Sequence, residues 1–149
     1  MLAFLFPDHA LPPAVRARIA LLRERAAGPD GLVTTCGGAS MEPAIRRGDQ
    51  VTVRARAPRT GAVAAFVTTR GELELHRLVA AAPGGWWAHL GDNQVDPSPG
   101  LVHATQVIGL AEVADRTPGM RARARALVRL ARAAARVAAR AARRPGSVT

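Results

Sequence analysis

The sequence predicts a mainly β fold, a coiled β-sheet or partly closed barrel flanked by an N-terminal helix and an arginine-rich C-terminal helix. Short apolar runs broken by Gly, Pro and Asp fill the middle of the chain, which favours strands. Helical spacing of apolar residues occurs only near the two ends. At 149 residues the chain is long enough for one core. We therefore expect an N-terminal amphipathic helix within residues 1–29, a β-domain over 30–116 and an Arg/Ala-rich helix over 120–145.

The first expected element is an amphipathic helix over residues 12–27. Pro12-Pro13 suits a helix start, and Gly28-Pro29 stops the helix. Charged residues such as Arg23 are expected on the solvent side. The apolar side is formed by four residues at helical spacing: Val15, Ile19, Leu22 and Ala26.

Short β-rich runs follow, with Gly-containing turns between several of them. No helical pattern separates the runs, so they are expected to form one compact coiled sheet or partly closed barrel. The six predicted strands are Leu32–Cys36, Gln50–Arg54, Ala62–Thr69, Glu72–Ala80, Trp86–Leu90 and Gln106–Val113.

The C-terminal helix is predicted to carry a basic stripe. Its arginines are spaced so that they fall within an arc of roughly 80°, while Leu127, Leu130 and Val137 point away from it. The stripe is expected either to make transient contact with an anionic membrane surface or to be only a solvated charged face. Its members are Arg125, Arg129, Arg132, Arg136, Arg140 and Arg143.

The amino-acid composition limits which classes of partner and cofactor are expected. All 21 basic residues are Arg, against 11 acidic residues, which gives a formal charge of +10 and suggests an anionic partner. The chain has no Tyr and few aromatics to stack on bases, which argues against nucleic acid. The single Cys36 and four His show no metal-ligand spacing, so we expect no metal and no other cofactor. The apolar start Leu2 to Phe6 is too short for a membrane span or a signal peptide, so a cytoplasmic protein, at most peripheral to a membrane, is expected.

The most informative segment runs from Ser40 to Val51 and reads S-M-E-P-A-I-R-R-G-D-Q-V. It resembles the nucleophile segment of the signal peptidase superfamily of serine peptidases, S-M-x-P-x-aliphatic-x-x-G-D-x-V. That superfamily includes bacterial and endoplasmic-reticulum signal peptidases and the self-cleaving SOS repressors. The resemblance implies a coiled β-sheet fold with Ser40 as the nucleophile.

The residues around Ser40 are assigned supporting roles. The glycine at position 38 and Ala39 allow a substrate strand to approach closely, and Met41 and Pro43 are expected to support the turn structurally. Gly38 has no side chain to donate to an oxyanion, so the backbone N–H of Ser40 is the expected first donor.

A serine nucleophile needs a base, and the chain contains no lysine. His76-Arg77, followed by aliphatic residues, stands where bacterial signal peptidases carry Lys-Arg. It resembles the Ser/His branch found in endoplasmic-reticulum and archaeal signal peptidases. A histidine with a pKa of about 6.5 can accept the serine proton without deep burial. The alternative is that His76 is an ordinary strand residue.

A third group should orient the imidazole of His76. Gly91-Asp92-Asn93 is similar to the last conserved box of the superfamily, which implies Asp92 for this role, with Asp96 as the alternative carboxylate. Asp92-Asn93 also suits a plain β-turn.

These features together predict a soluble, signal-peptidase-like serine endopeptidase that processes a precursor protein or peptide. The resemblance implies small substrate side chains at the first and third positions before the cleaved bond. The substrate is expected to bind as an extended strand. The alternative is a catalytically idle peptidase fold that binds anionic membrane or nucleic acid through its arginine-rich helix.

Overall fold

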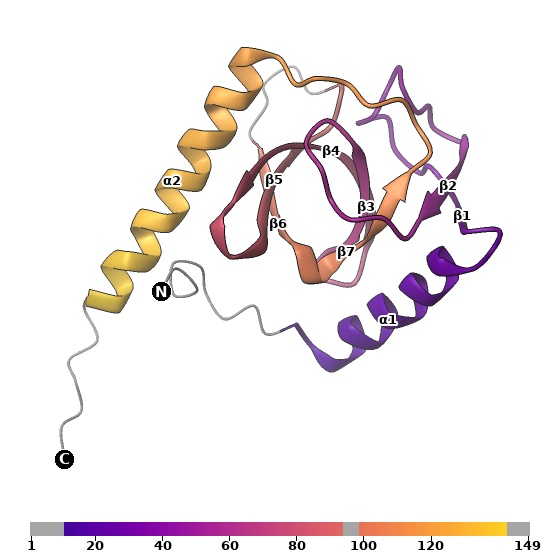
Figure 1. The fold of residues 1–149 in the computed structure, drawn as a ribbon, viewed down its shortest axis with the longest axis horizontal. Helices are drawn as coiled ribbons and strands as arrows, with labels where there is room; N and C mark the ends of the chain where they lie inside the picture. The colour runs from indigo at the N-terminus through magenta and orange to yellow at the C-terminus, as the bar shows by residue number, and fades with distance from the viewer. Residues whose placement is uncertain (1–10, 94–98, 143–149) are drawn as a thin grey trace.

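The computed structural model describes residues 11–93 and 99–142. In this part of the chain the elements are two α-helices, seven strands and two short 3₁₀ helices (Figure 1). They run in the order α1 (Pro13–Ala27), β1 (Leu32–Thr35), β2 (Gln50–Arg54), β3 (Val63–Val67), β4 (Leu73–Ala82), η1 (Pro83–Gly85), β5 (Trp86–Leu90), β6 (Gly100–His103), η2 (Ala104–Gln106), β7 (Val107–Ala111) and α2 (Met120–Ala142).

The strands form one antiparallel sheet in the order β1-β2-β7-β3-β4-β5-β6, with β1 and β6 at its edges. The mainly β class is therefore confirmed, and all six expected strands are present with small differences at their ends. The seventh strand, β6, was not expected. Only Leu101 and Val102 are apolar in this strand, which is too short a run to stand out in the sequence.

Helix α1 covers one face of the sheet. Val15, Ile19 and Ala26 are buried against residues of β2, β3 and β7, as the helical spacing predicted. Arg23 differs from the expectation, because its guanidinium donates to the carbonyls of Val107, Ala104 and Thr105 instead of facing solvent alone. This contact ties α1 to the η2–β7 segment.

A second core lies on the other face of the sheet. It joins Phe66 of β3, Leu78 of β4 and Val102 of β6 in one buried cluster. Since β3 and β6 are not neighbours in the strand order, the sheet must curl to bring them together, as Figure 1 shows. The sheet is therefore strongly coiled, while its two edge strands do not pair with each other.

Helix α2 packs on β4 and β5 through its first half. Ala126 and Leu130 are buried there against Val79, Ala88 and Leu90. Leu127 is 56% exposed, although it was expected, like Leu130, to point away from the basic stripe.

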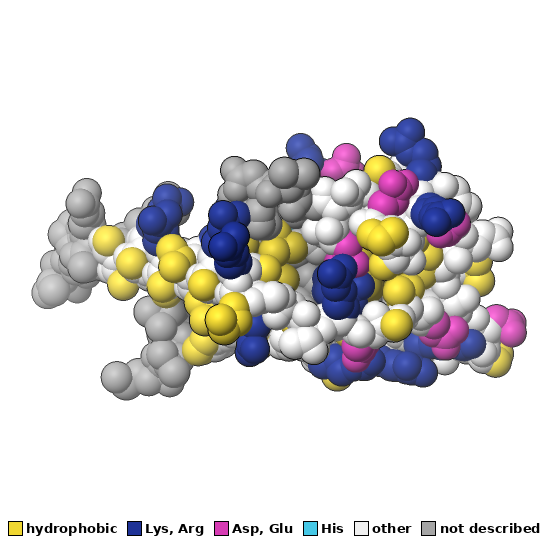
Figure 2. All heavy atoms as spheres, turned by 90° about the horizontal axis from the view of Figure 1, so that it is seen from above, with side chains coloured by type: hydrophobic (Ala, Val, Ile, Leu, Met, Phe, Trp, Pro, Cys, Tyr) yellow, Lys and Arg dark blue, Asp and Glu magenta, His cyan; other side chains and the backbone are white. Residues whose placement is uncertain are grey.

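The basic stripe is only partly described. Arg125, Arg129, Arg132 and Arg136 are exposed, and Figure 2 shows arginine and apolar side chains together along the projecting helix. The described part of the structure does not include the side chains of Val137 and Arg140 or any of Arg143. Neither helix, within residues 11–93 and 99–142, contains a stretch long and apolar enough to cross a membrane.

Candidate active site

Ser40 lies on a turn between β1 and β2, with its side chain exposed. The next residue, Met41, is completely buried in a cluster that includes Cys36, Ile45 and Val51. Met41 therefore anchors the turn to this buried cluster. The peptide bond from Glu42 to Pro43 is cis, and Pro43 belongs to the same turn.

The loop after β5 holds this turn in place. The amide of Asn93 donates to the carbonyl of Ser40 at 2.9 Å, and its side-chain amide donates to the carbonyl of Ala39 at 3.3 Å. Gly91 is packed so closely that a Cβ there would lie 2.5 Å from the Ser40 carbonyl oxygen. Gly91 and Asn93 thus fix the backbone of the residue expected to be the nucleophile.

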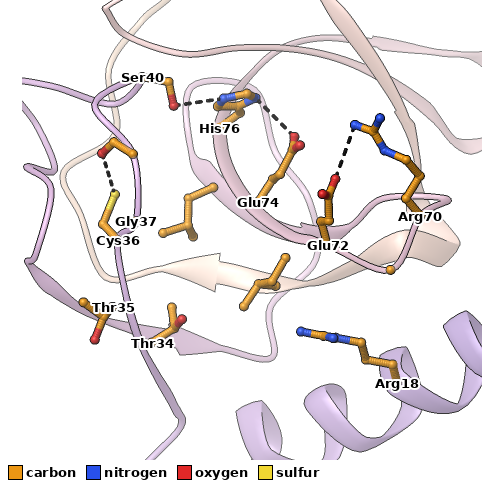
Figure 3. Close-up of a pocket in the computed structure, with 14 residues that line it drawn as sticks. Arg18, Thr34, Thr35, Cys36, Gly37, Ser40, Arg70, Glu72, Glu74 and His76 are labelled. Carbon is orange, nitrogen blue, oxygen red and sulfur yellow. Dashed lines mark hydrogen bonds and ion pairs between the residues drawn. The ribbon is translucent and has the colours of Figure 1, made fainter.

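The structure brings Ser40 and His76 together from positions far apart in the sequence. His76 lies on β4, and its Nε2 is 3.2 Å from Oγ of Ser40 (Figure 3). Burial is the main cause that lowers the pKa of His76 below its usual 6.5, while Glu74 and Asp92 oppose the shift. The imidazole is therefore neutral at neutral pH and can accept a proton from the serine.

Asp92 has a different partner from the one expected. Its two oxygens accept from Nε and Nη2 of Arg77 at 2.8 and 2.7 Å, and both side chains are only 5% exposed. Arg77 also donates to the carbonyls of Gly61 and Ala114. Asp92 therefore belongs to a buried ion pair beside the site and makes no described hydrogen bond to His76. Asp96, the alternative carboxylate, lies outside the described residues.

Two other side chains approach the second ring nitrogen of His76. Its Nδ1 is 3.0 Å from Nδ1 of His89 on β5 and 3.9 Å from Oε2 of Glu74. Neither His89 nor Glu74 was expected from the sequence to have a role at the site. Alternation along the strand places Glu74 on the same face as His76, so the sequence alone could have predicted that these two side chains are neighbours. The contact with His89 depends on how β5 is registered against β4, which the sequence does not show.

An open groove runs beside Ser40 and His76 (Figure 3). One wall is Thr34 to Gly38, at the end of β1 and the loop that follows; the other is Arg70 to His76, leading into β4. A Cβ at Gly37 or Gly38 would meet nothing within 4 Å, so the space beside these residues is free.

Both walls of the groove offer unpaired strand edges. β1 is an edge strand, and residues 73–76 of β4 pair with β3 on one side only, because β5 pairs from Arg77 onward. No other strand in the described chain occupies the space between them. The backbone N–H and C=O groups along these edges are available to an added strand.

Comparisons with known proteins assign no family. No protein-family model matches the chain, and no curated protein is significantly similar to it. In residues 11–93 and 99–142, no group of three or more His, Cys, Asp or Glu side chains is arranged to hold a metal ion.

Proposed function

We propose that the chain is a serine endopeptidase of the signal-peptidase-like kind, with Ser40 as nucleophile and His76 as general base. The observation that carries this proposal is the 3.2 Å separation between Oγ of Ser40 and Nε2 of His76 beside an open groove. A neutral imidazole at hydrogen-bond distance is what an unactivated serine hydroxyl requires.

The proposed reaction is acyl transfer in two halves. Oγ of Ser40 attacks the carbonyl carbon of the substrate while its proton passes to Nε2 of His76. The imidazolium then gives this proton to the leaving amine as the C–N bond breaks, which leaves an ester on Ser40. Water, deprotonated by His76, hydrolyses that ester and regenerates the serine. The amide of Ser40, which makes no hydrogen bond within the described residues, is proposed to donate to the developing oxyanion.

The proposed substrate is a precursor protein or peptide bound as an extended strand. The free edges of β1 and of residues 73–76 in β4 face the groove from opposite sides, so an inserted strand can hydrogen-bond to both. Such main-chain pairing supplies affinity with little demand on sequence. Side chains at alternate positions would then select the cleavage site.

The alternative proposal is a binding module that docks on an anionic membrane or nucleic acid through α2. It is supported by the exposed Arg125, Arg129, Arg132 and Arg136. A purely binding role has no need for the Ser40–His76 contact, which is why we favour the peptidase.

The test is a comparison of newly formed protein N-termini in the native host expressing either the wild-type chain or Ser40→Ala. Ser40 is exposed, so this substitution leaves the fold intact. We expect a set of N-termini that only the wild-type chain generates. A control variant with Arg125, Arg129, Arg132 and Arg136 replaced by Gln tests α2 alone. If the wild-type and Ser40→Ala profiles are identical and only the Gln variant changes cellular behaviour, the peptidase proposal is wrong and the binding module is favoured.

A further inference from the structure

The second ring nitrogen of His76 contacts an imidazole where a triad would have a carboxylate. The two Nδ1 atoms of His76 and His89 are 3.0 Å apart, the ring centroids are 5.1 Å apart and the ring planes differ by 27°. Glu74 is the nearest carboxylate, but its Oε2 is 3.9 Å from the same nitrogen, beyond hydrogen-bond range. His89 is therefore the hydrogen-bond partner of His76.

The sheet builds a specific place for the His89 ring. Leu78 of β4 pairs with His89 of β5, so His76, two residues before Leu78, is the diagonal neighbour of His89 on the same face. On the other side His89 pairs with Gly100 of β6, where an added Cβ would clash with the imidazole. Phe66 contacts the ring at a centroid distance of 4.7 Å. The ring is thus confined by three strands and is 9% exposed.

Two nitrogens at this distance share one proton, and its position decides whether His76 can act as a base. If Nδ1 of His76 carries the proton, Nε2 is free to accept from Ser40. If His89 is the donor, the neutral His76 must carry its own proton on Nε2 and cannot deprotonate the serine. Only the first arrangement is compatible with catalysis.

The surroundings keep His89 neutral. Burial is the main cause that lowers its pKa to about 3, and the nearby His76 and Arg129 of α2 act in the same direction. A neutral imidazole retains one acceptor nitrogen, so His89 with its own proton on Nε2 can accept a hydrogen bond at Nδ1.

We propose that His89 is a positioning residue whose Nδ1 accepts a hydrogen bond from Nδ1–H of His76 and so keeps Nε2 of His76 unprotonated toward Ser40. His89 would thereby replace the carboxylate of a Ser-His-Asp triad. The inference rests on the proposed function, because orienting a base has a purpose only if Ser40 reacts.

The test reads the tautomer of His76 directly by NMR of the full-length chain labelled with ¹⁵N-histidine. Ring nitrogens with and without a proton differ strongly in ¹⁵N chemical shift, and the chain has only four histidines. The matched variants are His89→Asn and His89→Leu. The two side chains have similar shape, but only the Asn oxygen keeps an acceptor at the position of Nδ1. Glu74→Gln is the control for the other neighbour, and backbone amide spectra report whether each variant is folded.

We expect the wild type, His89→Asn and Glu74→Gln to hold His76 as the Nδ1–H tautomer, and His89→Leu to shift it toward Nε2–H. The proposal is overturned if His76 is the Nε2–H tautomer in the wild type, or if Glu74→Gln rather than His89→Leu changes the tautomer.

The rate at which a fluorophosphonate modifies Ser40 gives the second readout. His89→Leu should lower the rate of Ser40 modification about 10- to 100-fold, and His89→Asn should keep most of the wild-type rate. Absence of Ser40 modification in every chain would refute the proposed function, while the NMR result still decides the role of His89.

Discussion

At the scale of single residues, adjacent positions on β4 perform separate tasks because side chains alternate across a strand. His76 points to the groove and Ser40, whereas Arg77 points into the protein and pairs with Asp92. The adjacent His and Arg of the sequence motif therefore point to opposite faces of one strand. His76 is held by its own strand, and the loop that fixes the Ser40 turn is held by Arg77.

A prediction at this scale concerns stability at acidic pH. His89 has a folded pKa of about 3, below its unfolded value near 6.5, so the unfolded chain binds a proton first as the pH falls. The stability that depends on neutral His89 is complete above about pH 6.5 and is lost progressively between about pH 6.5 and pH 3. His76 shifts in the same direction, but it is present in both chains compared below.

We expect denaturant unfolding to show that, between about pH 7 and pH 5, the wild type loses about 2 kcal/mol more stability than His89→Leu. The variant lacks the titrating group and keeps the buried apolar contact with Phe66. Parallel loss in the two chains over this pH interval would show that His89 is not held neutral by the fold.

At the scale of elements, the turn that carries Ser40 depends on the loop after β5. Gly91 and Asn93 contact the Ser40 segment directly, and the buried pair between Asp92 and Arg77 fixes this loop to β4. Breaking a buried pair leaves an uncompensated charge in a medium of low polarity, which is costly.

We predict that Asp92→Asn lowers the free energy of unfolding by about 3–5 kcal/mol, measured by denaturant titration. The matched control is Asp115→Asn. It removes the same kind of bidentate pair with Arg59, but there the side chains are 50% and 45% exposed. This control should cost less than about 1 kcal/mol. Equal costs in the two variants would contradict the structural role assigned to Asp92.

At the scale of the whole molecule, helices pack on the sheet and a groove beside Ser40 leaves two strand edges open. Helix α1 covers one face and α2 packs on β4 and β5, while the coil of the sheet encloses a second core. The edges of β1 and of residues 73–76 in β4 stay open beside Ser40. An open pair of edges next to Ser40 is the architecture that the proposed endopeptidase requires to bind an extended substrate.

The sequence was informative about features that lie within one segment, and less so about contacts that depend on how strands are paired. The turn of Ser40 and Met41 followed from a contiguous motif, and His76 from its context in one strand. The partner of Asp92 and the approach of His89 arise between strands distant in the chain, so neither spacing nor composition shows them. Strand β6 has too few apolar residues to be recognised, yet its Gly100 is what leaves room for His89.

The most direct test of the central claim is the rate of covalent modification of Ser40 by an alkyl fluorophosphonate, followed by intact mass and peptide mapping. In this reaction Oγ of Ser40 forms a bond to phosphorus, fluoride leaves, and the serine proton passes to His76. We predict modification at Ser40 in the wild type, none in Ser40→Ala, and a rate at least about 100-fold lower in His76→Ala. Modification of His76→Ala at the wild-type rate, or at a residue other than Ser40, would contradict a serine nucleophile activated by His76.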